Sequence, residues 1–252
     1  MFRLFVFNTV RKSIRMTFVM RTLGLIGITW ISTAVYFKTI NRIISERLGG
    51  AHSAEILLYS IDFQEFKSLM AENSWEQIEG MLSGIARRLE SAGADCIVIC
   101  SNTPHLAADT IRQKIQIPLL HIAEETAKAV LKQGASKVGL LGTKFTMEDS
   151  FFKARLSKFG VETLIPDGED REFVHASILN ELTAGIFKAE TKRKYLEIIE
   201  KLRGDGAQGV ILGCTEIPLL IAQSDCSLTV FDTTAIHSEA AADFALSGFS
   251  RG

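Results

Sequence analysis

A cysteine and a serine each follow a short apolar run, and both could take part in proton transfer. Cys214 comes directly after GVILG and before Thr-Glu, and Ser101 comes directly after CIVIC. A free thiol has a pKa of about 8.5 and becomes a base or nucleophile once it is deprotonated. A serine hydroxyl is a much weaker acid. Residues of these two types could take up or release a proton in general acid–base catalysis. The alternative for Cys214 is an inert, buried thiol, but its place after a glycine at a strand end is unfavourable for core packing.

The two residues occupy equivalent places in an internal duplication. LGLIGITW at 23–30 is echoed by VGLLGTKF at 138–145, and CIVICSNTPH at 96–105 by GVILGCTEIP at 209–218. Gly27 precedes Ser101 by 74 residues, and Gly142 precedes Cys214 by 72. The sequence therefore predicts two similar lobes. Ligands of open parallel sheets collect outside the carboxyl ends of the strands. If the lobes face each other, Ser101 and Cys214 lie opposite each other across one cleft.

Short β-branched runs alternate with longer stretches of helical period from Met20 onward, which is typical of βα units and a mostly parallel sheet. A helix at 31–48 places Ile40 and Ile44 on a broad apolar face and ends at Gly49-Gly50. The expected strands are 23–27, 55–61, 96–100, 119–121, 137–142, 161–165, 209–212 and 228–231. The predicted fold class is thus α/β.

Five segments resemble the aspartate/glutamate racemase family, in family order across nearly the whole chain. They are LGLIG-x-x-W, SNTPH, LLGTKFTM, GVILGCTEI and FDTTAIH. The combination of GCTE with FDTTAIH is specific, whereas LGLIG alone is common among nucleotide-binding folds. The resemblance implies two flavodoxin-like or Rossmann-like lobes with parallel sheets, related by a pseudo-twofold axis, with a cleft between them. It also implies that no cofactor is used.

The resemblance further implies that two residues on opposite faces of an amino acid exchange its α-proton, and Cys214 matches the second of them. At the first, the family pattern C-N-T or T-N-T becomes Ser101-Asn102-Thr103, and Cys100 is displaced by one residue. Successive side chains of a strand point to opposite faces, so Cys100 is expected in the core and Ser101 at the site. Because serine is the weaker acid, we expect a reaction biased toward one direction.

Polar residues on the turns after the strands are candidates for substrate binding. Asn102, Thr103, Thr143, Thr215 and Glu216 all lie on these turns. Their side chains either cap the following helices or bind a substrate carboxylate, and both roles are compatible. Backbone N–H groups at the helix N-termini would hold the developing enolate-like charge. Glu216 either orients its neighbours or favours the positive end of a helix dipole.

The segment 27–33 is one residue shorter than the family run G-G-M-S-W-E-S-T and lacks its acid, so one wall of the cleft has changed. Met70 and Thr183 stand where relatives carry Gln and Lys. Arg21, Lys144 and Lys188 are other sources of positive charge. Aspartate or glutamate remains the substrate that the resemblance implies.

Two further functions stay open. One is a single-cysteine enzyme of the same fold, resembling the arylmalonate decarboxylases or maleate isomerases. The other is a non-catalytic ligand-binding relative.

Composition limits the partners. The chain has 252 residues, 47% hydrophobic and 23% charged, which is sufficient for a large core in one or two lobes. A net charge of −1 gives no electrostatic footprint for nucleic acid. The five histidines show no metal-ligand spacing, so no metal is predicted. The expected partner is a small-molecule amino acid or dicarboxylate, and the resemblance implies a homodimer.

The remaining predictions concern compartment and boundaries. The four cysteines show no disulfide-scaffold density, and no secretory signal is evident, so a reducing, cytoplasmic setting is expected. Residues 1–45 hold seven Lys or Arg and no acid, but apolar runs in the leader are too short to cross a membrane. Residues 1–19 are read as an extension before a native start at Met20 or Met16. Residues 20–118 with 228–250 are assigned to the first lobe, and 119–227 to the second.

Overall fold

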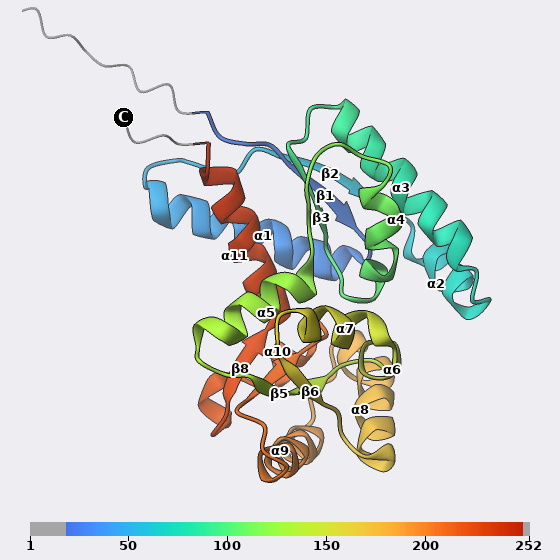
Figure 1. The fold of residues 1–252 in the computed structure, drawn as a ribbon, viewed down its shortest axis with the longest axis vertical. Coiled ribbons are helices and arrows are strands. Elements are labelled where there is room, and N and C mark those ends of the chain that lie inside the picture. Colours follow the sequence, from blue (N-terminus) through green and yellow to red (C-terminus); the bar gives the residue numbers. More distant parts are fainter. Residues whose placement is uncertain (1–18, 249–252) are drawn as a thin grey trace, which may run out of the picture.

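The structure is a computed structural model that describes residues 19–248, and it consists of two lobes stacked one above the other (Figure 1). Each lobe contains a four-stranded parallel sheet. The first sheet has the order β2 (Ile56–Ser60), β1 (Leu23–Gly27), β3 (Cys96–Ile99) and β4 (Leu119–Leu120). The second has the order β6 (Glu162–Leu164), β5 (Lys137–Leu141), β7 (Gly209–Leu212) and β8 (Thr229–Asp232). The two orders correspond strand for strand, and the predicted strands are confirmed to within one residue at each end.

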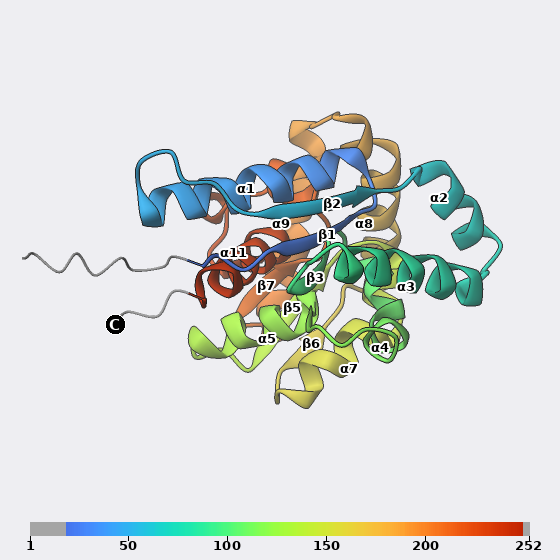
Figure 2. The same cartoon turned by 90° about the horizontal axis from the view of Figure 1, so that it is seen from above.

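The strands of the first sheet are buried on both faces because helices cover both. Leu25 and Val98 point to the face covered by α1 (Trp30–Leu48) and α11 (Thr233–Leu246). Ile26 and Ile97 point to the opposite face, covered by α3 (Trp75–Ser91). Figure 2 shows α1 running beside β2. This alternation explains why the central strands read as uninterrupted apolar runs.

The second lobe has one continuous core between its helices. On one side α5 (Ile122–Lys132) packs against α7 (Ser150–Lys158), and α8 (Gly168–Asn180) contacts α9 (Ala189–Gly204). The other helical elements are short: α2 (Phe63–Ala71), η1 (Thr103–Ala107), α4 (Ala108–Arg112), α6 (Lys144–Glu148), η2 (Leu182–Ala184), α10 (Ile217–Leu220) and η3 (Gln223–Asp225).

The first helix matches its prediction closely. The Thr29 hydroxyl accepts a hydrogen bond from the Ser32 N–H at 3.1 Å, so the helix begins at Trp30, one residue before the predicted start. Its end is at Leu48, as predicted, because Gly49 adopts φ 71° and its N–H bonds to the Ser45 carbonyl. Glycine is favoured in that left-handed conformation.

Two strands lie in the opposite sheets from those that the predicted lobe boundaries imply. Leu119–Leu120 was assigned to the second lobe, but β4 pairs with β3 of the first sheet. Thr229–Asp232 was assigned to the first lobe, but β8 pairs with β7 of the second. The chain changes lobes only after each of these strands, through α5 and α11. An apolar run in the sequence predicts a strand but not the sheet in which it pairs, which is why the assignment was wrong.

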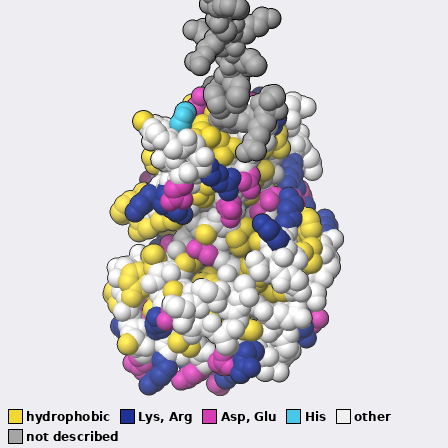
Figure 3. Space-filling model, turned by 90° about the vertical axis from the view of Figure 1, so that its left-hand side faces the viewer, with side chains coloured by type: hydrophobic (Ala, Val, Ile, Leu, Met, Phe, Trp, Pro, Cys, Tyr) yellow, Lys and Arg dark blue, Asp and Glu magenta, His cyan; other side chains and the backbone are white. Residues whose placement is uncertain are grey.

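The last helix returns to the first lobe and lies against its first helix. Helix α11 packs on both α1 and α5. Arg47 of α1 is ion-paired with Asp243 and, at 3.3 Å, with Glu239 of α11. These pairs are exposed and contribute little stability each. On the face drawn in Figure 3, basic and acidic side chains lie next to one another across the middle of the molecule.

None of the helices within residues 19–248 has the length and apolar character needed to cross a membrane. The predicted extension at 1–19 falls outside the described residues except for Val19.

The glycine that opens β7 should not tolerate a side chain. A Cβ on Gly209 would lie 2.5 Å from the Phe231 ring and 3.0 Å from the Thr229 carbonyl oxygen. Gly209→Ala is therefore expected to lower the free energy of unfolding by about 1–3 kcal/mol, measured by chemical denaturation. The matched control is Gly204→Ala at the end of α9, where nothing lies within 4 Å. That control should be neutral or stabilising by up to about 1 kcal/mol, and equal losses in both variants would contradict the packing argument.

Candidate active site

The turn after β7 carries Cys214, and close packing of two strand ends fixes its path. The Gly213 N–H donates to the Leu141 carbonyl of β5 at 2.7 Å. A Cβ on Gly213 would lie 3.0 Å from that oxygen and from the Thr146 side chain. Glycine is needed there because the backbones of the two lobe-two turns approach so closely. The chain then emerges to place Cys214 and Thr215 in half-buried positions before α10.

The Cys214 thiol is bonded to the carboxylate two residues later. Sγ–H donates to Glu216 Oε2 at 2.9 Å, and the same oxygen accepts from the Thr215 hydroxyl at 2.7 Å. Burial and, next, the Glu216 carboxylate raise the pKa of Cys214 well above its ordinary value. The resting group is therefore a thiol with a carboxylate already in place to accept its proton. Glu216 itself is buried, with 8% of its surface exposed.

Removing the charge of Glu216 should lower the pKa of Cys214, because the negative carboxylate is one cause of its elevation. We expect Glu216→Gln to accelerate alkylation of Cys214 by iodoacetamide at neutral pH by at least about threefold. The measurement is best made in a Cys226→Ala background, because Cys96 and Cys100 are fully buried and Cys226 is the other half-buried thiol. An unchanged or slower rate in the glutamine variant would show that the Glu216 carboxylate does not raise the pKa of Cys214.

The turn after β3 carries Ser101, and its carbonyl groups accept hydrogen bonds from two side chains. Cys100 has no exposed surface and packs in the lobe-one core, as expected, while Ser101 is half-buried. The Ser32 hydroxyl donates to the Cys100 carbonyl at 3.0 Å. His105 Nδ1–H donates to the Ser101 carbonyl at 2.8 Å. The strand alternation thus separates the two residues as predicted.

A short hydrogen-bonded path joins the two turns. Asn102 Nδ2 donates to the Thr233 hydroxyl at 3.2 Å, and that hydroxyl donates to the Leu212 carbonyl at 3.0 Å. Leu212 is the last residue of β7, two residues before Cys214, and Asn102 follows Ser101 directly. Thr233 is fully buried at the start of α11. Two hydrogen bonds therefore connect the strand-end turn of one lobe with that of the other.

The other predicted binding residues differ in what they contact. The Thr143 hydroxyl caps α6, accepting from the Thr146 N–H at 3.4 Å, and Thr215 is bonded to Glu216. Thr103 opens η1 in a half-buried position. Asn102 is 5% exposed, and its side-chain oxygen is buried without a hydrogen-bond partner. Asn102 thus has an acceptor available for a ligand donor, whereas the hydroxyl of Thr143 serves its helix.

Cations near this edge of the second lobe are already paired. Lys144 Nζ lies 2.5 Å from Glu172, and Lys188 Nζ lies 2.9 Å from Glu181. Arg21 lies over the Phe244 ring, 5.0 Å from its centroid, at the amino end of β1 and therefore away from the strand ends that bear the site.

Met70 and Thr183, which stand where relatives carry Gln and Lys, make contacts within their own lobes. Met70 packs on the lobe-one core, and the Thr183 hydroxyl donates to the Leu179 carbonyl at 3.0 Å.

Three histidines from different segments of the chain form a buried cluster beside Ser101. The His105 ring centroid lies 4.8 Å from that of His121 and 5.4 Å from that of His237. Burial lowers the pKa of all three, of His121 and His237 to about 3 and of His105 well below its usual value. The sequence gives no sign of this cluster, because His237 lies more than 100 residues from both of its partners. Within residues 19–248, no group of His, Cys, Asp or Glu is arranged to hold a metal ion.

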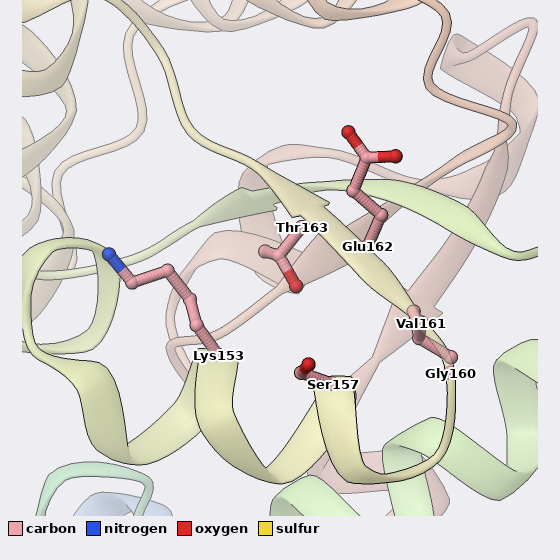
Figure 4. Close-up of a pocket in the computed structure, with 6 residues that line it drawn as sticks. All are labelled: Lys153, Ser157, Gly160, Val161, Glu162 and Thr163. Atoms are coloured by element: carbon pink, nitrogen blue, oxygen red, sulfur yellow. The ribbon is translucent and has the colours of Figure 1, made fainter.

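A surface hollow of about 380 Å³ lies elsewhere in the second lobe (Figure 4). Lys153 and Ser157 of α7 line it together with Glu162 and Thr163 of β6. Glu162 is ion-paired with Lys137, the first residue of β5, at 3.1 Å. The hollow therefore lies at the amino ends of the strands, opposite to the edge that carries Cys214.

Fold and site together define a two-lobed α/β protein with a thiol after a central strand of one lobe and a hydroxyl after the equivalent strand of the other. A family model described as Asp/Glu/Hydantoin racemase matches residues 25–241. The chain belongs to this family.

Individual relatives agree with this assignment. The chain is similar to the crystal structure of a candidate Asp/Glu racemase from Yersinia pestis, with 48% identity and a TM-score of 0.87 over 90% of this chain and 100% of that one. It is similar to an aspartate racemase homologue from Pyrococcus horikoshii OT3, with 37% identity and a TM-score of 0.80 over 90% and 99%. It is 27% identical over 154 residues to the broad specificity amino-acid racemase RacX of Bacillus subtilis (strain 168), covering 60% of this chain and 64% of that one. The curated relatives are thus matched over about half to two thirds of their length.

Proposed function

We propose that the protein is a cofactor-independent amino-acid racemase that acts on aspartate, glutamate or both. The observation that carries this proposal is the path from Asn102 through Thr233 to Leu212, because it ties together the two turns that bear Ser101 and Cys214. A racemase needs one acid–base group on each face of the substrate α-carbon. Membership of the racemase family supports this use of the two turns.

In the first half-reaction, Cys214 loses its proton to Glu216 and then removes the α-proton of the amino acid. The C–H bond breaks, an S–H bond forms, and the electron pair passes into the substrate carboxylate as an enolate-like anion. The 2.9 Å bond between the thiol and Glu216 supports this assignment of the first proton acceptor. Because the pKa of the thiol is raised, the thiolate that forms is a strong base, which suits it to remove a weakly acidic α-proton.

In the second half-reaction, a proton reaches the opposite face of the anion from the Ser101 hydroxyl, which is then reprotonated by water, and Glu216 returns its proton to water. A hydroxyl is a weak acid, so delivery from this face is the slower step. The reaction is therefore biased toward one direction. Replacement of a thiol by Ser101 at this position supports the bias.

Binding of the amino acid is assigned to the turn residues. The unpartnered, buried oxygen of Asn102 accepts from the substrate ammonium group, and Thr103 and neighbouring backbone N–H groups bind its carboxylate. The hydroxyls of Thr143 and Thr215, which are bonded to Thr146 and Glu216 in the free protein, turn to the same carboxylate when substrate is bound. Several relatives are named glutamate racemases or aspartate racemase homologues, which supports these two substrates. A homodimer in a reducing, cytoplasmic setting completes the proposal and is testable by light scattering of the purified chain.

A second candidate is a single-cysteine decarboxylase or cis–trans isomerase of the same fold. The observation that favours it is the serine opposite Cys214, since one thiol is sufficient for those reactions. The ion pairs of Lys144 and Lys188 also leave these cations less available for a second substrate carboxylate. A ligand-binding relative without turnover is the third candidate.

Proton NMR in deuterium oxide separates the three. The purified protein is incubated with L- and D-aspartate and L- and D-glutamate, then with neutral amino acids, and the α-proton signal is followed. Loss of the signal supports a racemase, and different rates for the two enantiomers support the bias. No exchange across the panel contradicts the proposal. Release of carbon dioxide from a substituted malonate then identifies a decarboxylase, and ligand-induced thermal stabilisation without reaction identifies a binding protein.

A further inference from the structure

The carbonyl groups of three consecutive residues around Ser101 accept hydrogen bonds. Ser32 donates to the Cys100 carbonyl at 3.0 Å, and His105 Nδ1–H donates to the Ser101 carbonyl at 2.8 Å. The Asn102 carbonyl accepts from the His105 backbone N–H at 3.0 Å and lies 3.3 Å from Nδ1 of the same ring. Because the main chain is held on both sides of Ser101, the position of its Cβ is fixed and its hydroxyl is confined to a few rotamers.

The second nitrogen of His105 connects this turn to the segment that crosses between the lobes. Nε2 accepts from the Ile122 N–H at 3.3 Å. Ile122 is the first residue of α5, which packs against α7 of the second lobe and against α11. With 2% of its surface exposed, the His105 side chain is enclosed between these elements. One imidazole therefore spans the Ser101 turn and the inter-lobe helix.

These contacts fix the protonation state of the ring. Nδ1 must carry the hydrogen, because the Ser101 carbonyl only accepts, and Nε2 must be bare, because Ile122 donates to it. A protonated ring would set an N–H against an N–H in a buried place. The geometry thus agrees with the lowered pKa of His105.

The neighbouring histidines support His105 by packing and do not bond to the Ser101 turn. His237 Nε2–H donates to the Leu120 carbonyl at 3.0 Å, and its Nδ1 accepts from the Tyr36 hydroxyl at 3.0 Å. His121 Nδ1 accepts from the Ala123 N–H at 3.2 Å. His237 is as fully buried as His105, so it provides a control at the same site.

We propose that His105 is a positioning residue for Ser101, which sets the reach of the Ser101 hydroxyl toward the substrate face opposite Cys214. This inference rests on the proposed function. His105 does not touch the reacting atoms; it acts through the Ser101 carbonyl. A displacement of about 1 Å at a reacting group is enough to cost roughly 10²-fold in rate.

Two measured rates distinguish a role of His105 in positioning Ser101 from a role in stabilising the fold. Exchange of the α-proton with deuterium, starting from the enantiomer whose proton faces Cys214, needs only Cys214 and solvent. Conversion to the other enantiomer also needs delivery from the Ser101 face. The ratio of conversion to exchange therefore reports on Ser101 alone, and a loss of folded protein lowers both rates without changing the ratio.

The chain offers matched variants at one position. In His105→Asn the side-chain amide nitrogen takes the place of Nδ1 and can still donate to the Ser101 carbonyl. In His105→Gln the amide reaches the place of Nε2 and leaves that carbonyl without its donor. We expect His105→Gln to lower the conversion-to-exchange ratio by about 10- to 100-fold and His105→Asn to restore it to within about threefold of wild type. His237→Gln should lower the melting temperature and leave the ratio unchanged.

Equal ratios in His105→Gln, His105→Asn and wild type would overturn the inference, as would an equally lowered ratio in His237→Gln. If His105→Gln does not fold, His105→Asn decides. A folded asparagine variant that keeps exchange but loses more than tenfold of conversion contradicts positioning through the Ser101 carbonyl. Failure of the proposed function is a different result, because wild type itself then shows no exchange that depends on Cys214.

Discussion

Cys214→Ala should lose at least about 10³-fold of the rate of α-proton exchange while it keeps its fold. The loss of exchange is expected for the enantiomer whose α-proton faces Cys214, and a loss of conversion is expected for both enantiomers. For one, Cys214 removes the proton; for the other, it supplies the proton that completes conversion. Cavity formation is small, because the change removes a single sulfur atom from a half-buried position. The measurement is proton NMR in deuterium oxide with matched concentrations of folded protein.

The control for this substitution is Cys226→Ala. Cys226 is a free, half-buried thiol that packs against the lobe-two core, as Cys214 does. It lies before β8, at the opposite end of the sheet from the strand ends that bear the site. Exchange in Cys226→Ala should equal that of wild type. If both alanine variants keep full exchange, Cys214 is a packing residue and the proposed mechanism is wrong.

The fold was largely predictable because its signals are local. Each central strand is a continuous apolar run that ends in glycine or a small polar residue, and the duplication gives the same order twice. The pairing of β4 and β8 was not predictable in the same way. Both strands are short and precede helices that change lobes, so only contacts far apart in the sequence decide the sheet to which each belongs.

The residues of the candidate site were also predictable only where their signals are local in the sequence. Ser101 and Cys214 follow from strand-end position and alternation, and Cys100 is in the core as expected. Thr233 and His105 were missed as site residues, although both lie in segments quoted for the family resemblance, FDTTAIH and SNTPH. Their roles depend on partners at Leu212 and Ile122, which no local pattern indicates.

The protonation state of Cys214 was also not predictable from the sequence. Burial and Glu216 raise the pKa of its thiol above the ordinary value. The helix that follows, α10, is only four residues long and provides little dipole. In the proposed mechanism, Cys214 is therefore activated by proton transfer to Glu216 and does not rest as a preformed thiolate.

The protein should lose stability steeply in mild acid. His105, His121 and His237 are neutral in the folded state, with pKa values lowered chiefly by burial and, for His121 and His237, to about 3. In the unfolded chain each has a pKa of about 6.5. As the pH falls below about 6.5, the unfolded state binds protons that the folded state cannot, so the free energy of unfolding decreases.

The expected slope is large for a chain of this size. Each histidine contributes about 1.4 kcal/mol per pH unit over the range between its unfolded and folded pKa, which gives about 3 kcal/mol per unit for His121 and His237, and His105 adds to the loss in the same direction. A fall from about pH 6 to pH 4.5 would then remove at least roughly 4 kcal/mol, a large part of the stability of a typical domain. Paired carboxylates such as Glu124, whose pKa is lowered beside Arg112, add to the loss only at more acidic pH.

Urea denaturation at a series of pH values between 7 and 4.5 measures this slope. His121→Asn should reduce it by about one third, because an asparagine oxygen can replace Nδ1 as the acceptor for the Ala123 N–H and cannot be protonated in this range. The matched control is His52→Asn, which changes an exposed histidine and should leave the slope as it is. If wild type and His121→Asn unfold with the same pH dependence, His121 is not held neutral by its surroundings, and the hydrogen-bond directions assigned to the cluster are wrong. A smaller slope confined to His121→Asn instead establishes that burial keeps this imidazole uncharged where its ring packs on that of His105.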